Sequence, residues 1–186
     1  ISNSLALNVK NGMQIDSMNN LINELDKNTH LIVFCGLPAS GKSTFYSKYL
    51  KHLNYNHVSR DQLKTMDSCV RKAERHLIEK QNCVIDNTNL EVDSRLKWIQ
   101  LARKHDVSVY LFHFDVSLEH ALHNNLFRKL QGAIYNVSEI LIRSFNKKFV
   151  MPTADEGFTE IYKINFVPHF NKTEDESLYK MMLCER

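Results

Sequence analysis

Residues 31–44 read LIVFCGLPASGKST, and this stretch decides the fold. A five-residue apolar run leads into Gly36, and Gly41 follows in the spacing G-x-x-x-x-G-K-S. Glycines supply the positive φ angles that a tight loop needs when its backbone N–H groups curl around phosphate oxygens. Lys42 adds a positive charge at this loop, and Ser43 adds a hydroxyl that can bind magnesium.

The loop therefore predicts a site for a nucleoside triphosphate with magnesium. A helix is expected over 42–53, and its N-terminal amides would face the same anion. An accidental glycine-rich turn is the alternative, but the chain has only five glycines and two of them hold the obligatory positions of the motif. The residues predicted to bind the nucleotide are Gly36, Leu37, Pro38, Ala39, Ser40, Gly41, Lys42, Ser43 and Thr44.

Length and composition indicate one globular domain. With 186 residues, of which 43% are hydrophobic, the chain is large enough to bury a core without disulfides or structural metals. Its apolar runs are shorter than a membrane span, and its first residues lack the pattern of a signal peptide. The four cysteines form no C-x-x-C pair, so we expect neither disulfides nor zinc. These features predict a soluble intracellular protein.

The net charge is only +3, but the basic residues concentrate between residues 41 and 150. This distribution suits an anionic ligand held at one site better than indiscriminate coating of a nucleic-acid lattice. Ordinary solvated helix faces are the alternative, and charge alone does not exclude them.

Apolar periodicity alternates between strands and helices along the chain. Strands are expected over 30–35, 55–58, 83–86, 107–115 and 159–166, and helices over 16–27, 42–53, 61–81, 93–105, 117–131 and 137–149, before a polar tail. Such alternation indicates parallel strands joined by right-handed crossovers. We therefore predict an α/β fold with a doubly wound, mainly parallel five-stranded sheet that binds its ligand at the carboxyl ends of the strands.

An aspartate follows the strand expected at 55–58, in the sequence Ser59-Arg60-Asp61. Helix capping is one interpretation, because Ser59 with Gln62 three residues later forms a capping box. Capping does not require the Arg60-Asp61 pair, which sets a cation and a carboxylate at the mouth of a phosphate site. We therefore predict that Asp61 takes a proton from a hydroxyl as a general base and that Arg60 contacts the substrate.

A second aspartate, Asp86, ends the strand expected at 83–86. P-loop proteins often place a carboxylate at such a position, where it holds magnesium. We predict Asp86 and Ser43 as the metal-binding residues. A simple turn formed by Asp86 with Asn87 and Asn89 is the alternative.

The helix expected at 117–131 carries an apolar stripe with Arg128 at its border, so Arg128 can reach outward. His120 and His123 have the spacing of a metal pair on this helix. Because no acidic or cysteine partner completes a site, we interpret both as surface histidines. We interpret Trp98 as a core residue and not as a platform for base stacking.

Five segments together resemble the kinase domain of the polynucleotide kinase/phosphatase family, with a more distant similarity to phage polynucleotide kinase. The segments are GLPASGKSTF (36–45), HVSRD (57–61), VIDNTN (84–89), HNNLFR (123–128) and PTADEGF (152–158). The first is generic among P-loop proteins, and the other four are more restrictive. The resemblance covers nearly the whole chain and implies an adenylate-kinase-like P-loop kinase with a helical lid at about 123–150.

The resemblance implies a polynucleotide 5′-hydroxyl kinase that uses ATP and Mg²⁺ and acts on DNA ends in strand-break repair. RNA ends are the other possible polynucleotide acceptor. Two further alternatives stay open at this point: a P-loop kinase acting on a small-molecule hydroxyl, and a non-catalytic module whose binding depends on a nucleotide.

The resemblance also implies roles for individual residues. Lys42 and Ser43 would bind ATP and magnesium, and Asp61 would be the general base toward the 5′-hydroxyl. Arg128 would be a lid residue on the transferring phosphate, so Asp61, Lys42 and Arg128 are the predicted catalytic residues.

The resemblance also predicts which residues contact the acceptor. The resemblance implies that Asp86 and Thr88 lie near the acceptor end, and with Arg60 they are the predicted substrate-binding residues. The family pattern also places the segment 152–158 near the adenine.

The relatives implied by this resemblance often carry an N-terminal phosphatase with a D-x-D-G-T motif, which this chain lacks. The chain also begins at Ile1. We expect residues 1–186 to be a single kinase domain excised from a longer bifunctional protein, without 3′-phosphatase activity. We further expect a monomer that binds no membrane and, in a eukaryote, acts in the nucleus.

Overall fold

The computed structural model describes residues 21–23, 25, 27–133, 136–168, 170 and 172–184. Five strands in these residues form one sheet in the order β2-β3-β1-β4-β5, and every neighbouring pair is parallel. The strands are β1 (His30–Cys35), β2 (Asn56–Val58), β3 (Cys83–Ile85), β4 (Ser108–Asp115) and β5 (Glu160–Asn165). The predicted doubly wound parallel sheet is confirmed.

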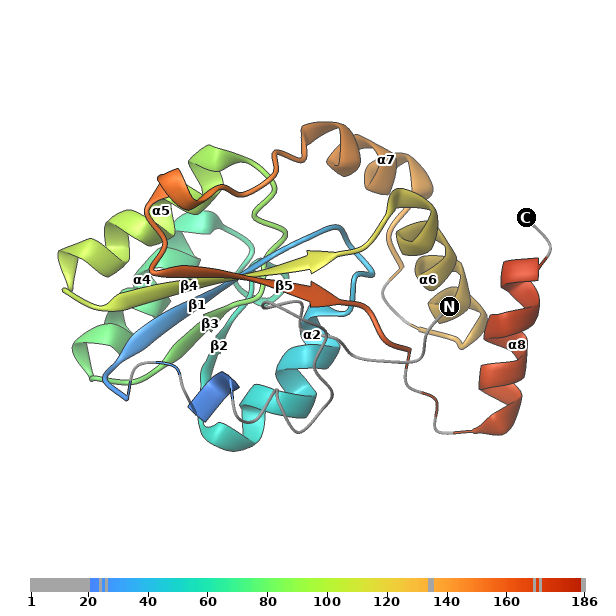
Figure 1. Cartoon of the computed structure of the whole chain (residues 1–186), viewed down its shortest axis with the longest axis horizontal. Coiled ribbons are helices and arrows are strands. Elements are labelled where there is room, and N and C mark those ends of the chain that lie inside the picture. The colour runs from blue at the N-terminus through green and yellow to red at the C-terminus, as the bar shows by residue number, and fades with distance from the viewer. Residues whose placement is uncertain are drawn as a thin grey trace.

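Helices flank this sheet on both faces (Figure 1). The first is α2 (Lys42–Phe45), which continues through a π turn, η1 (Tyr46–Leu50), and a 3-10 turn, η2 (Lys51–Leu53), over the span expected for one helix. The others are α3 (Arg60–Leu63), α4 (Met66–Ile78), α5 (Val92–Lys104), α6 (Leu118–Leu130), α7 (Glu139–Lys148) and α8 (Thr173–Cys184), with a 3-10 turn η3 (Ala154–Glu156). Helices α4 and α5 cover one face and α2 the other, while α6, α7 and α8 lie beyond the carboxyl ends of β4 and β5.

Two helical predictions need correction, and a third lies mostly outside the described residues. The region expected as one helix over 61–81 is broken, because Lys64 adopts a positive φ of 68° and Thr65 caps a new helix by accepting from the Ser68 N–H. The expected polar tail contains α8, whose first turn is acidic and therefore matches the helix dipole. Of the helix expected over 16–27, residues 21–23 are helical, and most of the rest lies outside the described residues.

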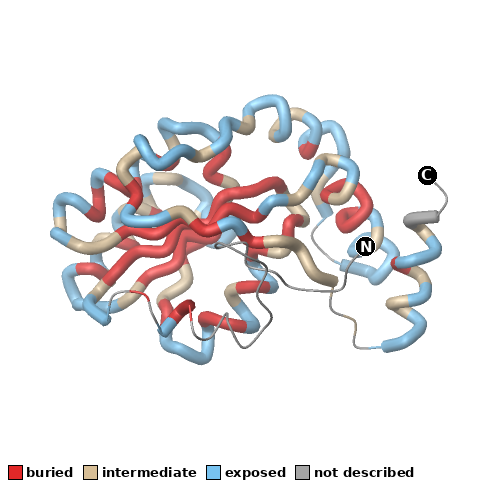
Figure 2. The backbone as a smooth tube through the Cα atoms, in the orientation of Figure 1, coloured by how far each residue is buried: buried red, intermediate tan, exposed pale blue. Residues whose placement is uncertain are grey.

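Alternation along β1 divides the core into two layers. Ile32 and Phe34 point to the α2 side, where aromatic side chains such as Phe45 and Phe112 pack against them. Leu31 and Val33 point to the side covered by α4 and α5. Figure 2 shows that burial concentrates in the strands. A strand buried on both faces is typical of a parallel sheet, and it holds the loop that follows β1 on a rigid base.

The prediction that Trp98 is a core residue is confirmed. Trp98 is fully buried in the layer beneath α5, and its indole N–H donates to Asn89 Oδ1 over 3.1 Å. Cys35, Cys69 and Cys83 are buried free thiols. No helix in the described part of the chain is long and apolar enough to cross a bilayer.

Candidate active site

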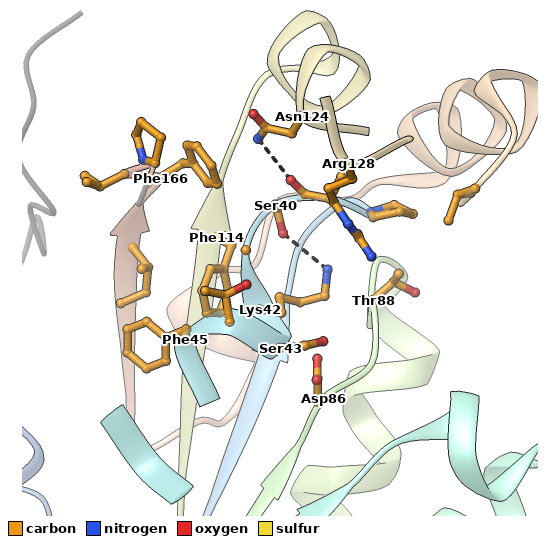
Figure 3. A pocket seen from close by; sticks show the side chains of 18 of the residues that line it. Ser40, Lys42, Ser43, Phe45, Asp86, Thr88, Phe114, Asn124, Arg128 and Phe166 are labelled. Atoms are coloured by element: carbon orange, nitrogen blue, oxygen red, sulfur yellow. Dashed lines mark hydrogen bonds between the residues drawn. The ribbon is translucent and has the colours of Figure 1, made fainter. Parts of the chain in front are cut away.

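A cavity of about 620 Å³ lies where the carboxyl ends of the strands meet. Its wall contains the turn after β1 and α2, the residues that follow β2 and β3, the helix α6, and the segment that follows β5 (Figure 3). Among the predicted site residues, those on the wall are Pro38, Ala39, Ser40, Gly41, Lys42, Ser43, Thr44, Arg60, Asp61, Asp86, Thr88 and Arg128. Gly36 and Leu37 lie behind this wall and begin the loop. The fold thus gathers residues that are distant in sequence into one site.

The loop between β1 and α2 requires its two glycines. Gly36 has φ 153°, and an added Cβ would lie 2.9 Å from the Phe114 carbonyl oxygen. Gly41 has φ 93°, and an added Cβ would lie 3.2 Å from the Phe166 ring. The Gly36 N–H donates to the Thr88 carbonyl over 3.0 Å, which ties the loop to the residues after β3. The loop is therefore held by neighbours on both sides.

Lys42 is buried at the base of this loop. Its ammonium donates to the carbonyls of Gly36 and Leu37 over 3.0 and 2.6 Å, and to Ser40 Oγ over 3.2 Å. Burial lowers the pKa of Lys42 to about 8, and the nearby carboxylates of Asp86 and Asp61 oppose that shift. The Lys42 ammonium is therefore held inside the loop, near two carboxylates, where it can bind an anion.

The chemistry around Ser43 and Asp86 fits a magnesium ion. Figure 3 shows the Ser43 hydroxyl and the Asp86 carboxylate facing each other at the start of α2. Asp86 is only 7% exposed, and its Oδ2 accepts a hydrogen bond of 3.0 Å from His57 Nε2, so its other oxygen remains available. Magnesium takes oxygen ligands and keeps several waters, so a hydroxyl and one carboxylate suffice. Among the described residues, no cluster of three histidines, cysteines or acids offers another metal site.

His57 orients the Asp86 carboxylate. Its ring stacks on Tyr46 with a centroid separation of 4.2 Å, and its own carbonyl accepts from Lys72 Nζ over 2.9 Å. Sequence reasoning quoted His57 within a motif but assigned it no role. Its position could have indicated this role, because His57 lies on β2, two residues before Ser59, and the neighbouring strand β3 is followed by Asp86.

Asp61 lies in the first turn of α3 and is exposed to solvent on the cavity wall. Ser59 caps this helix, with its hydroxyl accepting from the Asp61 N–H over 3.3 Å and not from Gln62 as the predicted capping box required. The Arg60 N–H donates to Asn87 Oδ1 over 2.8 Å. Ser59 therefore caps α3 while the Asp61 carboxylate stays exposed on the cavity wall.

Helix α6 brings Arg128 over the loop. In Figure 3 the guanidinium of Arg128 extends toward Lys42 and Thr88. On the same helix, Asn124 Nδ2 donates to the Ala39 carbonyl over 3.0 Å. Helix α6 therefore contacts the loop directly through Asn124, while Arg128 reaches across the mouth of the loop.

The histidine interpretation was wrong for His123, which is 1% exposed. Its ring packs against Tyr179 of α8 with a centroid separation of 4.3 Å. His120 is partly exposed and hydrogen-bonds to the same Tyr179 hydroxyl. Because α8 was not predicted, the surface that covers these histidines was missing from the sequence analysis.

The segment 152–158, which the resemblance places near the adenine, does not line the cavity. It precedes β5 and packs against α5. Glu156 instead pairs with the fully buried Arg95 of α5 over 2.7 Å. The residues after β5, among them Phe166 and Val167, form the apolar wall of the cavity.

Comparisons with known proteins agree with this geometry. The family model described as AAA domain matches residues 31–72 and 64–152 of the chain. A bifunctional polynucleotide phosphatase/kinase from Schizosaccharomyces pombe is 37% identical over 136 residues, which cover 73% of this chain and 33% of that protein. The chain therefore spans about a third of the length of this relative. These matches confirm the resemblance that the five segments indicated.

Solved structures share the fold at low identity. The structure of Chaetomium thermophilum Kti12 in complex with ADP-AlF3 is 15% identical, with a TM-score of 0.61, over 83% of this chain and 97% of that chain. A gluconokinase from Sinorhizobium meliloti 1021 is 13% identical, with a TM-score of 0.55, over 83% of this chain and 90% of that chain. The chain therefore shares the fold of these two proteins.

Proposed function

We propose that this chain, which belongs to the AAA domain family, transfers the γ-phosphoryl group of ATP to the 5′-hydroxyl end of a DNA strand. The products would be ADP and a 5′-phosphate that a ligase can use in strand-break repair. The observation that carries the proposal is the shared cavity, in which an exposed carboxylate after β2 lies on the same wall as a phosphate loop. The similarity to a polynucleotide phosphatase/kinase favours a polynucleotide as acceptor.

The donor would be held by the loop and the start of α2. Backbone N–H groups of the loop would face the β- and γ-phosphates, and the Lys42 ammonium would neutralise part of their charge. Ser43 and Asp86 would hold magnesium, which would supply positive charge to offset that of the phosphates. The apolar wall at Phe166 and Val167 would cover the nucleobase.

Asp61 would accept the proton of the 5′-hydroxyl as its oxygen attacks the γ-phosphorus. The bond between that phosphorus and the ADP oxygen breaks as the new ester bond forms, so atoms and charge balance. Arg128 would stabilise the charge on the transferring group from the lid. Arg60 and Thr88 would contact the acceptor strand. Catalysis then rests on positioning and on electrostatics, because the loose transition state needs little covalent help.

The experiment that tests this function is a transfer assay with γ-labelled ATP and magnesium. A 5′-hydroxyl oligodeoxynucleotide should acquire the label, while the same strand with a 5′-phosphate serves as the matched control and should not. An oligoribonucleotide and a small polyol such as gluconate test the other acceptors. Labelling of the small alcohol in preference to the strand, or no transfer to the strand at all, would overturn the proposal.

A further inference from the structure

A chain of hydrogen bonds connects the C-terminal helix α8 with the phosphate loop. The Tyr179 hydroxyl donates to Asn124 Oδ1 over 2.6 Å, and Asn124 Nδ2 donates to the Ala39 carbonyl over 3.0 Å. His120 Nε2 lies 2.8 Å from the same hydroxyl. Because the single hydroxyl proton goes to Asn124, His120 is the donor in this contact. The hydrogen bonds therefore run in one direction: from His120 on α6 to Tyr179 on α8, then to Asn124 on α6, and from there to Ala39 in the loop.

The two central residues of this chain, Tyr179 and Asn124, are shielded from water. Tyr179 and Asn124 are each 4% exposed, and the Tyr179 ring packs edge-on against Phe127 and His123. Burial raises the pKa of Tyr179, so the hydroxyl keeps the proton that it donates. Hydrogen bonds in such a low-dielectric setting are stronger, and losing one partner leaves the other unsatisfied.

The end of the chain is a strained point of the loop. Ala39 has φ 60°, a left-handed conformation that is unfavourable for a residue with a Cβ. A peptide unit is planar, so a bond to the Ala39 carbonyl also fixes the direction of the Ser40 N–H. The Ser40 N–H itself donates to the Leu37 carbonyl over 3.3 Å, so this peptide unit is held by Leu37 within the loop and by Asn124 from outside it (Figure 3).

We propose that Tyr179 is a positioning residue for the donor nucleotide, acting through Asn124 on the peptide between Ala39 and Ser40. The helix α8 is then part of the nucleotide site and not only a cover for α6. Tyr179 also lines the cavity itself, next to the loop that it orients. This inference rests on the proposed function, because it takes the loop to be the site of the ATP phosphates.

The test uses Tyr179→Phe, which removes the hydroxyl and leaves the ring contacts in place. The affinity for Mg·ATP is measured by calorimetry, together with kcat and the KM values for ATP and for the oligonucleotide. The Kd and KM for ATP should rise roughly fivefold, as for the loss of one buried hydrogen bond. The KM for the oligonucleotide and kcat should stay within about twofold, a split that a general loss of structure would not produce.

A double-mutant cycle and a matched control complete the design. Asn124→Ala should weaken Mg·ATP binding as well, and Tyr179→Phe should then add almost nothing in the Asn124→Ala background, because both changes cut one chain. Tyr162→Phe is the control, since it removes the hydroxyl of another buried tyrosine, which donates to Glu160 on β5 away from the cavity wall. Its Mg·ATP affinity should equal that of the wild type.

Two results would overturn the inference: wild-type Mg·ATP affinity in Tyr179→Phe, or fully additive effects of Tyr179→Phe and Asn124→Ala. A thermal melt verifies that each variant is folded before binding is measured. If the wild type binds Mg·ATP but labels no oligonucleotide, the proposed function fails while calorimetry still decides the role of Tyr179.

Discussion

The proposed donor and acceptor halves of the cavity are built differently. The donor half, residues 36–44, is tied down by its neighbours: Lys42 makes three hydrogen bonds within it, and Asn124 and Thr88 hold it from outside. The acceptor half, helix α3 with Asp61, is one exposed turn attached mainly through backbone contacts. A small charged nucleotide benefits from a preorganised cradle, whereas a polymer end has to enter from solvent.

This contrast predicts that changes in the acceptor half and the lid will affect the transfer rate without affecting nucleotide binding. Changes in the donor half should affect nucleotide binding first. Five predictions separate the two halves in order of expected effect.

Arg128→Ala should lower the single-turnover transfer rate about a thousandfold or more, because a phosphate-stabilising arginine contributes on that scale in phosphoryl transfer. The affinity for ATP, measured by calorimetry, should be mostly retained. Lys129→Ala, on the same exposed end of α6, is the matched control and should transfer normally. A rate within a few-fold of the wild type would remove Arg128 from the catalytic residues.

Asp61→Asn should abolish most transfer, by roughly a hundredfold or more, because the amide cannot accept the hydroxyl proton. Nucleotide affinity and the urea unfolding midpoint should stay at wild-type values, since the side chain is exposed. Asp67→Asn, in the first turn of α4, controls for the loss of one negative charge. A robust residual rate that does not depend on pH would mean that Asp61 is only structural.

The affinity for Mg·ATP should fall as pH rises through the pKa of Lys42, which burial lowers to about 8. A nucleotide binds the ammonium form better, so the Kd should rise roughly tenfold between about pH 7.5 and about pH 9. Calorimetry across this range measures the change, and Lys42→Met should show weak binding with a flat profile. A wild-type Kd that is constant over the range would contradict the account.

The same shift predicts the sign of a stability change. The folded-state pKa of Lys42 lies below the unfolded value of 10.5, so between these two values the unfolded chain binds more protons. Burying the charge therefore costs stability below pH 8, and this cost should disappear as pH rises toward 10.5. Compared with Lys42→Met by urea unfolding, the wild type should gain stability over this window, and a relative loss would refute the sign.

Ser59→Ala should have the smallest effect, a loss of about 1 kcal/mol in the free energy of unfolding, because it removes the cap of α3. The transfer rate should stay within a few-fold of the wild type. Urea unfolding and the labelled-ATP assay measure the two quantities. A large loss of transfer rate at unchanged stability would give Ser59 a catalytic role and contradict the view that it only caps α3.

The sequence allowed prediction of those parts of the molecule that depend on local patterns. The strand β1 and its loop followed from an apolar run and two glycines, and all five strands were located. The positions of Asp61 and Asp86 after strands followed from the rule that parallel strands end at one edge. Each of these features is encoded within a few neighbouring residues.

The features that were missed depend on contacts between distant segments. Helix α8 was missed, although Leu178 and Tyr179 behind an acidic first turn gave a weak helical signal. Without α8, nothing indicated that His123 would be covered. The apolar wall after β5 was likewise hidden, because the order of the strands decides how close the carboxyl end of β5 lies to the loop. Tertiary packing, and not local propensity, fixed these positions.

The central claim is that the Asp61 carboxylate and a nucleotide in the phosphate loop face each other across room for one sugar hydroxyl. A crystal structure with magnesium and a non-hydrolysable ATP analogue measures this directly. The account predicts the γ-phosphate in the loop beside Lys42, with the Asp61 carboxylate directed toward it at a separation that one hydroxyl can bridge. A carboxylate turned away from the γ-phosphate, or a nucleotide bound outside the loop, would contradict it.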